Sequence, residues 1–198
     1  MLDFYRRKIE YVRISVTDRC NLRCRYCMPA DGVEKLSHED ILSFEEIVRV
    51  VRALAQLGIR KVRLTGGEPL LRRGIVDLVR EIKAVEGIER VALTTNGVLL
   101  ADLAEELRAA GLDGVNISLD TLAEDAFSDI TRRSASLLPV VRQGMEAALA
   151  AGLKTKLNCV PLKGINEAEL VSLAALAKER PIDVRFIELM PIGMAKEA

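Results

Sequence analysis

One pattern recurs along the chain: a short β-branched run, a loop, an amphipathic helical stripe, and a Gly or Pro before the next run. Most of the runs are near-continuous apolar stretches, which is typical of parallel strands covered by helices. The predicted strands are residues 11–16, 61–64, 91–93, 115–119, 157–160 and 184–187. Such alternation predicts parallel βα units joined by right-handed crossovers.

Apolar residues at helical spacing predict the covering helices. Ser43, with Glu46 three residues later, forms the sequence signature of a capping box before the first helix. The predicted buried stripes are Ile47, Val50, Val51 and Leu54; Ile75, Leu78, Val79 and Ile82; Leu100, Leu103, Ala104 and Leu107; a looser one at Leu137, Val141, Met145 and Ala148; and Leu170, Leu173, Ala174 and Ala177.

The length of the chain limits how far such a sheet can curl. A closed (β/α)₈ barrel typically takes about 250 residues, and this chain has 198. We therefore predict an α/β fold, a partial (β/α)6 TIM-type barrel of parallel strands, as a single domain over residues 1–198. A doubly wound Rossmann-type sheet is the structural alternative.

Composition limits the binding partners and the cellular location that we expect. Basic and acidic residues balance at 29 each, which gives no indication of nucleic acid or an anionic membrane as partner. No apolar run reaches the ~20 residues that span a bilayer, and the N-terminus lacks the apolar segment of a secretory signal. We expect a cytoplasmic protein, in which thiols stay reduced.

Polar or glycine-rich clusters follow the predicted strands. Examples are the segments 65–69, 94–97 and 118–120. The carboxyl ends of parallel strands form the functional face of α/β folds, so these clusters should converge on one site.

The cluster after the first strand contains Cys20, Cys24 and Cys27 in a Cys-x-x-x-Cys-x-x-Cys arrangement. Three thiolates in one short loop suit an iron–sulfur cluster. Three ligands for a cluster that can take four would leave one iron open to a non-protein group. Zinc is the alternative, although a structural zinc site takes four ligands and no fourth is evident.

Several predicted strands carry basic residues: Arg13, Arg63, Lys156 and Arg185. A charge inside an apolar strand is costly unless it meets an anion. A barrel interior lined by such residues favours a polyanion pocket, with phosphate as the obvious ligand. The alternative is that the arginines pair with glutamates across the strands.

Other residues of these clusters have simpler interpretations. Gly66 and Gly67 could form only a tight turn, or could let a ligand approach the backbone. Asp120 could cap the following helix. Met190 is of a residue type found more often in cores than in ligand sites.

The combination of motifs resembles the radical S-adenosylmethionine (SAM) superfamily and, within it, the GTP 3',8-cyclases of molybdenum-cofactor biosynthesis. The cysteine motif followed by Gly-Gly-Glu-Pro at residues 66–69 carries the first resemblance. The second is carried by segments 13–24, 26–29, 63–70, 94–97, 118–122 and 185–191, and it covers essentially the whole chain.

The resemblance implies the cofactors and the roles of individual residues. Cys20, Cys24 and Cys27 would hold a [4Fe–4S] cluster whose open iron chelates SAM. Residues implied to contact SAM are Tyr26, Gly66, Gly67, Glu68, Ser118 and Met190. Residues implied to contact GTP are Arg13, Arg63, Thr94 and Lys156, with Arg185 as a further candidate.

The resemblance also implies a lyase activity. The reduced cluster would cleave SAM to a 5'-deoxyadenosyl radical, which would abstract the ribose 3'-hydrogen of GTP and lead to the 3',8-cyclised nucleotide. The implied partners are GTP, a reducing electron donor and a second copy of the chain in a homodimer, with neither nucleic acid nor membrane.

The chain departs from this family pattern at one point. Such cyclases carry three more cysteines in a C-terminal extension, and no cysteine follows Cys159 here. We expect an N-terminal fragment rather than a short homologue, and one that does not complete cyclisation alone. The alternatives in function are another radical SAM enzyme, such as a peptide-modifying one, and a domain that binds a cluster or nucleotide without turnover.

Overall fold

The strands form one parallel sheet in sequence order. The computed structural model describes residues 2–34, 36–190 and 193–196 and contains a six-stranded sheet in the order β1 to β6. The strands are β1 (Tyr11–Ser15), β2 (Lys61–Thr65), β3 (Arg90–Thr95), β4 (Gly114–Ser118), β5 (Lys154–Cys159) and β6 (Ile182–Phe186). Since β1 and β6 are the unpaired edges, the sheet is an open barrel. The predicted partial (β/α)6 TIM-type barrel is confirmed, and the Rossmann-type alternative is wrong because its strand order reverses.

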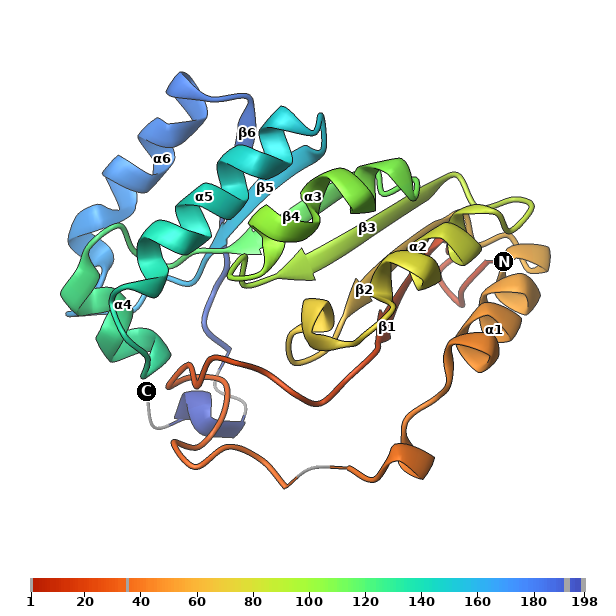
Figure 1. The fold of residues 1–198 in the computed structure, drawn as a ribbon, viewed down its shortest axis with the longest axis horizontal. Coiled ribbons are helices and arrows are strands. Elements are labelled where there is room, and N and C mark those ends of the chain that lie inside the picture. The colour runs from red at the N-terminus through yellow and green to blue at the C-terminus, as the bar shows by residue number, and fades with distance from the viewer. Residues whose placement is uncertain (1, 35, 191–192, 197–198) are drawn as a thin grey trace.

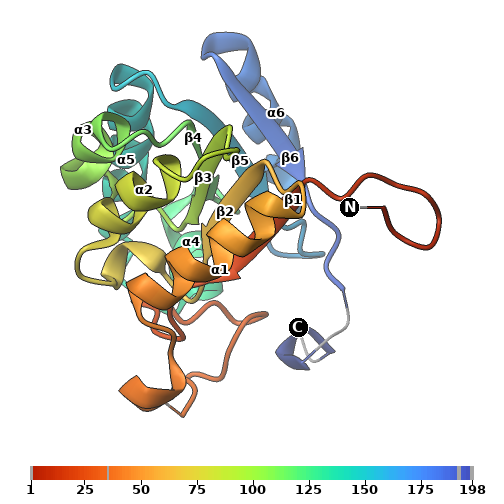
Figure 2. The ribbon, with the colours of Figure 1, turned by 90° about the vertical axis from the view of Figure 1, so that its right-hand side faces the viewer.

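Helices cover the outer face of the curled sheet (Figures 1 and 2). They are α1 (Phe44–Gln56), α2 (Ile75–Lys83), α3 (Leu100–Ala109), α4 (Glu124–Thr131), α5 (Leu137–Ala150) and α6 (Leu170–Glu179). Short 3₁₀ turns are η1 (His38–Asp40), η2 (Pro69–Leu71), η3 (Glu167–Glu169) and η4 (Gly193–Lys196). Helix α4 was not expected from the sequence. In the described ranges, no helix is both long enough and apolar enough to cross a membrane.

Alternate strand residues pack against these helices to form the core. Leu64, Leu93 and Ile117 point to the helices and are fully buried, whereas the intervening residues face the barrel interior. The stripe predicted for α2 is buried throughout. Each fully buried side chain of this kind contributes about 1.5–3 kcal/mol by leaving water.

Two of the predicted helical stripes are partly wrong. Val50 of α1 is 44% exposed, because the buried face of that helix runs through Val48 and Ala55 instead. In α6 only Leu173 is buried, and Ala174 and Ala177 are exposed. Figure 1 shows α6 at the end of the helical layer with α5 on one side only, so less of its surface is covered.

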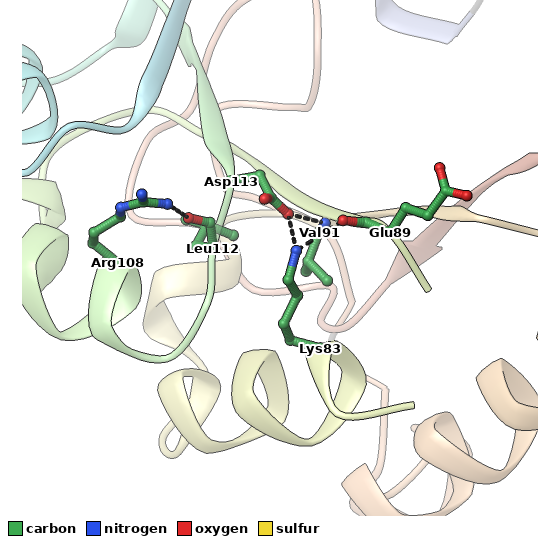
Figure 3. A network of polar contacts seen from close by, with 6 residues as sticks. All are labelled: Lys83, Glu89, Val91, Arg108, Leu112 and Asp113. Atoms are coloured by element: carbon green, nitrogen blue, oxygen red, sulfur yellow. Dashed lines mark hydrogen bonds and ion pairs between the residues drawn. The ribbon is translucent and has the colours of Figure 1, made fainter. Parts of the chain in front are cut away.

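Polar contacts tie the helices to the strands at the amino ends of the sheet. The Asp113 carboxylate, just before β4, accepts hydrogen bonds from Lys83 Nζ of α2 at 2.8 Å and from the Val91 amide of β3 at 2.7 Å (Figure 3). The predicted capping box of α1 is confirmed, since Glu46 N donates to Ser43 Oγ and Ser43 N donates to Glu46 Oε2. The Asp113 contacts lie at the amino ends of β3 and β4, whereas the capping box closes the amino end of α1.

Candidate functional site

The loop that carries the three cysteines follows β1 and is held by α4. The Arg23 amide donates to the Thr131 carbonyl and the Arg25 amide to the Ile130 carbonyl, both at 2.9 Å. The side chain of Arg133, just beyond α4, donates to the backbone carbonyl of residue 21 at 2.8 Å. Helix α4, which was not predicted from the sequence, therefore anchors the cysteine loop.

The thiols of Cys20, Cys24 and Cys27 surround one cavity of about 310 Å³ at the carboxyl ends of the strands. All three are free cysteines. Burial raises the pKa of each thiol, and the pKa of Cys24 reaches about 12 with a further contribution from the negative charge of Asp120. Such thiols ionise when a metal replaces their protons.

This arrangement fits a cluster better than a single ion. Among the described residues, no three Cys, His, Asp or Glu side chains are gathered tightly enough to hold one metal ion. A cubane cluster instead places its own iron and sulfide atoms between the cysteines. Cys20, Cys24 and Cys27 are therefore the residues that would hold it, with the cavity beside them open for a further ligand.

Gly66 and Gly67, after β2, pack directly under the cysteine loop. The Gly67 amide donates to the Thr17 carbonyl at 2.7 Å. A Cβ atom on Gly67 would lie 2.2 Å from the Arg19 carbonyl oxygen, and one on Gly66 would lie 2.5 Å from the Thr17 oxygen. These glycines are thus required for the close approach of two backbones, which neither sequence interpretation had foreseen.

Glu68 ties the second and third strand ends together from a buried position. The side chain is 1% exposed, and its oxygens accept from Thr95 Oγ1 at 2.8 Å, the Asn96 amide at 2.7 Å and the Leu70 amide at 3.0 Å. Burial raises the pKa of Glu68, and these hydrogen bonds oppose the rise. Glu68 is one of the residues that line the cavity, and its hydrogen-bond partners fix the orientation of its carboxylate.

Asp120, after β4, holds Tyr26 of the cysteine loop. The Tyr26 hydroxyl donates to Asp120 Oδ2 at 2.7 Å, and the Val160 amide donates to Oδ1 at 2.8 Å. The helix-cap interpretation of Asp120 is wrong, since α4 begins after Ala123. Sequence reasoning missed this positioning role, and the only signal for it was the place of Asp120 at a strand end.

A second cavity, of about 280 Å³, lies on the interior side of the sheet toward the amino ends of the strands and is strongly basic. Its lining includes Lys61, Arg63, Arg90, Lys154, Lys156 and Arg185. Polar atoms that are buried without a partner face the interior from three strands: Arg63 Nε, Thr94 Oγ1 and Asn158 Oδ1. Such groups are expensive to leave unsatisfied, so they indicate a place that a polar ligand completes.

Within the described part of the chain, most of the basic residues in the barrel form no ion pair. Lys156 pairs with Asp183 of the neighbouring strand, which is a different pair from the Arg–Glu pairs of the ion-pair alternative. None of the ion pairs found among the described residues involves Arg13, Arg63 or Arg185. The pKa of Arg63 is lowered by burial and then by the charges of Arg13 and Arg185, so these cations repel one another. A bound anion would relieve that repulsion.

The structure brings most of the predicted site residues together. The cysteine cavity is lined by Tyr26, Gly66, Gly67, Glu68, Ser118, Arg13 and Thr94, and the basic cavity by Arg63, Lys156 and Arg185. Met190 is the exception: it is 61% exposed and lies outside both linings. Pro191, the end of the last motif, lies outside the described residues.

An open parallel α/β barrel with three cysteines beside a cavity at its strand ends defines an iron–sulfur enzyme core of the partial-barrel class. The chain belongs to the radical SAM superfamily, whose family model matches residues 14–177. As in the rest of that superfamily, its cofactors are a [4Fe–4S] cluster and SAM.

Curated relatives and solved structures agree with this assignment. The chain is 56% identical over 196 residues to the GTP 3',8-cyclase of Moorella thermoacetica and 52% identical over 192 residues to that of Geobacter sulfurreducens. These alignments cover 98% and 96% of the chain but 60% and 58% of the relatives, so the chain spans about 60% of their length.

The fold is shared with more distant structures. Streptococcus suis SuiB, bound to its precursor peptide SuiA, superposes with a TM-score of 0.71 at 20% identity, over 92% of this chain and 40% of SuiB. Methylornithine synthase (PylB) gives 0.70 at 19% identity, over 91% of this chain and 53% of its own. At these identities the likeness shows the fold alone.

Proposed function

We propose that this chain is the radical-generating core of a GTP 3',8-cyclase. The observation that carries the proposal is the basic interior, where Arg63, Lys156 and Arg185 line a cavity on the same concave side of the sheet as the cysteine site, nearer the amino ends of the strands. A triphosphate carries several negative charges and many acceptor oxygens, which match guanidinium and ammonium donors. The high identity to the two named cyclases supports the same substrate.

The two cavities suggest where the cluster, SAM and GTP bind. Cys20, Cys24 and Cys27 hold the cluster, and SAM lies beside them against Tyr26, Gly66, Gly67, Glu68 and Ser118. GTP spans both cavities, against Arg13 and Thr94 of the cysteine cavity and Arg63, Lys156 and Arg185 of the basic cavity. When bound, the cluster and SAM supply a carbon-centred radical that removes a hydrogen atom from the substrate.

The protein's own residues orient the cofactor-binding groups and the substrate. Asp120 fixes the Tyr26 hydroxyl, and Glu68 fixes the turn after β2. The basic side chains neutralise the phosphates and set the position of the ribose relative to the cysteine cavity. Contact between Met190 and SAM remains a prediction and requires the segment after β6 to approach the cavity.

The proposal also includes an electron donor, a homodimer and a cytoplasmic location. A one-electron reductant must act on the cluster, and the homodimer remains a prediction. A cytoplasmic location is supported by the three free thiols of the cysteine loop, which an oxidising compartment would pair.

One experiment separates the functional alternatives. The chain is reconstituted anaerobically with iron and sulfide, and SAM cleavage to 5'-deoxyadenosine is measured with and without GTP. Cleavage stimulated by GTP supports the proposal, cleavage indifferent to GTP favours another radical SAM enzyme, and failure to form a cluster refutes both.

The substrate assignment has its own test. Arg63→Met should weaken GTP binding at least about tenfold, because charge-assisted hydrogen bonds are worth roughly 1.5–3 kcal/mol. Arg108→Met, on the outer helix α3, is the matched control and should bind GTP as wild type does. Equal affinity in both variants would refute the assignment of the basic cavity to GTP.

A further inference from the structure

One acidic side chain lies among the basic residues of the barrel interior. Successive strand residues alternate between the helix side and the interior, and Asp183 shares the interior side of β6 with Arg185. In the strands that the structure describes, the other charged residues on this side are all basic. Asp113 also borders the cavity, but it precedes β4 and is bound to Lys83 and Val91.

Asp183 is directly paired with a residue of the proposed phosphate site. The two strands place Asp183 opposite Lys156, and the carboxylate accepts a hydrogen bond from Lys156 Nζ. The pKa of Asp183 is lowered by that hydrogen bond, by the Lys156 charge, and further by Lys154 and Arg185. Asp183 is thus the counter-anion for several cations at once.

The two partners differ in exposure. The Lys156 side chain is 18% exposed and the Asp183 side chain 56% exposed. A carboxylate with that much access to water can leave the ammonium group at little cost, because solvent then hydrates it. Most of the Lys156 side chain is withdrawn from water, so its ammonium group needs another anion when the carboxylate leaves.

We propose that Asp183 is an internal anion that occupies Lys156 while the site is empty and limits the affinity of the basic cavity for polyphosphates. The inference rests on the proposed function of the same cavity and adds a residue that sets its specificity. An incoming phosphate replaces the carboxylate on Lys156 and remains close to its negative charge. The penalty therefore grows with the charge of the ligand, so Asp183 acts most strongly on triphosphates.

The size of the effect follows from Coulomb's law. A unit charge about 8 Å away in a water-like medium contributes about 0.5 kcal/mol for each ligand charge, and salt at physiological strength reduces this by roughly a factor of three. For a ligand of about four charges, removing Asp183 should tighten binding by about threefold to fivefold, and for a monophosphate by no more than about twofold.

The test compares three ligands on the cluster-reconstituted full chain by isothermal titration calorimetry. Asp183→Asn keeps the shape and removes the charge. We expect the variant to bind GTP and inorganic tripolyphosphate threefold to fivefold more tightly than wild type does, and GMP at most twofold more tightly. The matched control is Glu146→Gln, which breaks a comparable exposed ion pair with Arg180 on the outside of the barrel and should change none of the affinities.

The measured affinities support or overturn the role of Asp183. Unchanged or weaker polyphosphate binding in Asp183→Asn, equal gains for GMP and GTP, or no tripolyphosphate binding by either protein would overturn the inference. If tripolyphosphate binds more tightly to the variant but GTP binds no better than tripolyphosphate in either protein, the inference stands and the proposed substrate fails.

Discussion

Replacing Gly67 by alanine isolates the contact between the Gly-Gly-Glu-Pro turn and the cysteine loop. The added Cβ would lie 2.2 Å from the Arg19 carbonyl oxygen, 2.6 Å from its carbonyl carbon and 2.8 Å from the Asp18 oxygen. Real Cβ contacts essentially never fall below 3.0 Å. All three neighbours are backbone atoms, so no side chain can rotate away and the loop itself must move by most of an ångström.

The cost can be estimated from two contributions. Overpacking of this kind typically costs about 1–3 kcal/mol. The same movement lengthens the hydrogen bonds from the Gly67 amide to Thr17 and from the Glu68 amide to Arg19, both at 2.7 Å. Each such bond contributes about 0.5–1.5 kcal/mol. We therefore expect a loss of about 2–6 kcal/mol in the free energy of unfolding.

Urea unfolding of the cluster-free, reduced chain measures this loss by circular dichroism. With a slope of about 2 kcal/mol per molar urea, the midpoint should fall by about 1–3 M. Iron content after anaerobic reconstitution should fall as well, because the displaced loop carries Cys20. Gly152→Ala is the control: Gly152 has φ +72 and open space around it, so alanine there adds backbone strain without touching the loop.

A role of Gly67 in SAM binding alone would give a different result. If Gly67 served only to let SAM approach the backbone, alanine would weaken SAM binding and leave the unfolding midpoint of the cluster-free chain unchanged. That result would show that the close approach of the two backbones is not a constraint on the fold.

Three further predictions follow from other contacts. Asp113→Ala removes the acceptor for the Val91 amide and for Lys83, so the free energy of unfolding should fall by about 1–3 kcal/mol, whereas Lys83→Met keeps the amide bond and should cost under about 1 kcal/mol; equal losses in urea unfolding would contradict the network. Ser43→Ala removes the cap of α1 and should cost about 0.5–2 kcal/mol, and a thermal melt identical to that of wild type would argue against the cap. Cys24→Ala leaves two thiolates for the cluster, so iron and sulfide bound after reconstitution should fall to background, and retention of the visible absorption of the cluster would show that Cys24 is not a ligand.

Sequence pattern predicted the scaffold well because its signals are local. Alternating strands and helices have their own periodicities, so the six strands appear within a few residues of their expected positions. The failures lie where burial depends on neighbours. Val50 fits a helical stripe but faces solvent, and α4 has too short a stripe to stand out, although it anchors the cysteine loop.

The sequence by itself determined that polar segments converge at the carboxyl ends of parallel strands, since that follows from topology. It also determined the chemistry of the three cysteines, since softness and ligand number are properties of the residues. Only the tertiary structure decided which groups are paired. Asp120 holds Tyr26 rather than a helix end, and among the described residues Asp183 forms an ion pair with Lys156 whereas Arg13, Arg63 and Arg185 form none. Such pairings join residues distant in sequence, and they depend on side-chain distances that no local pattern encodes.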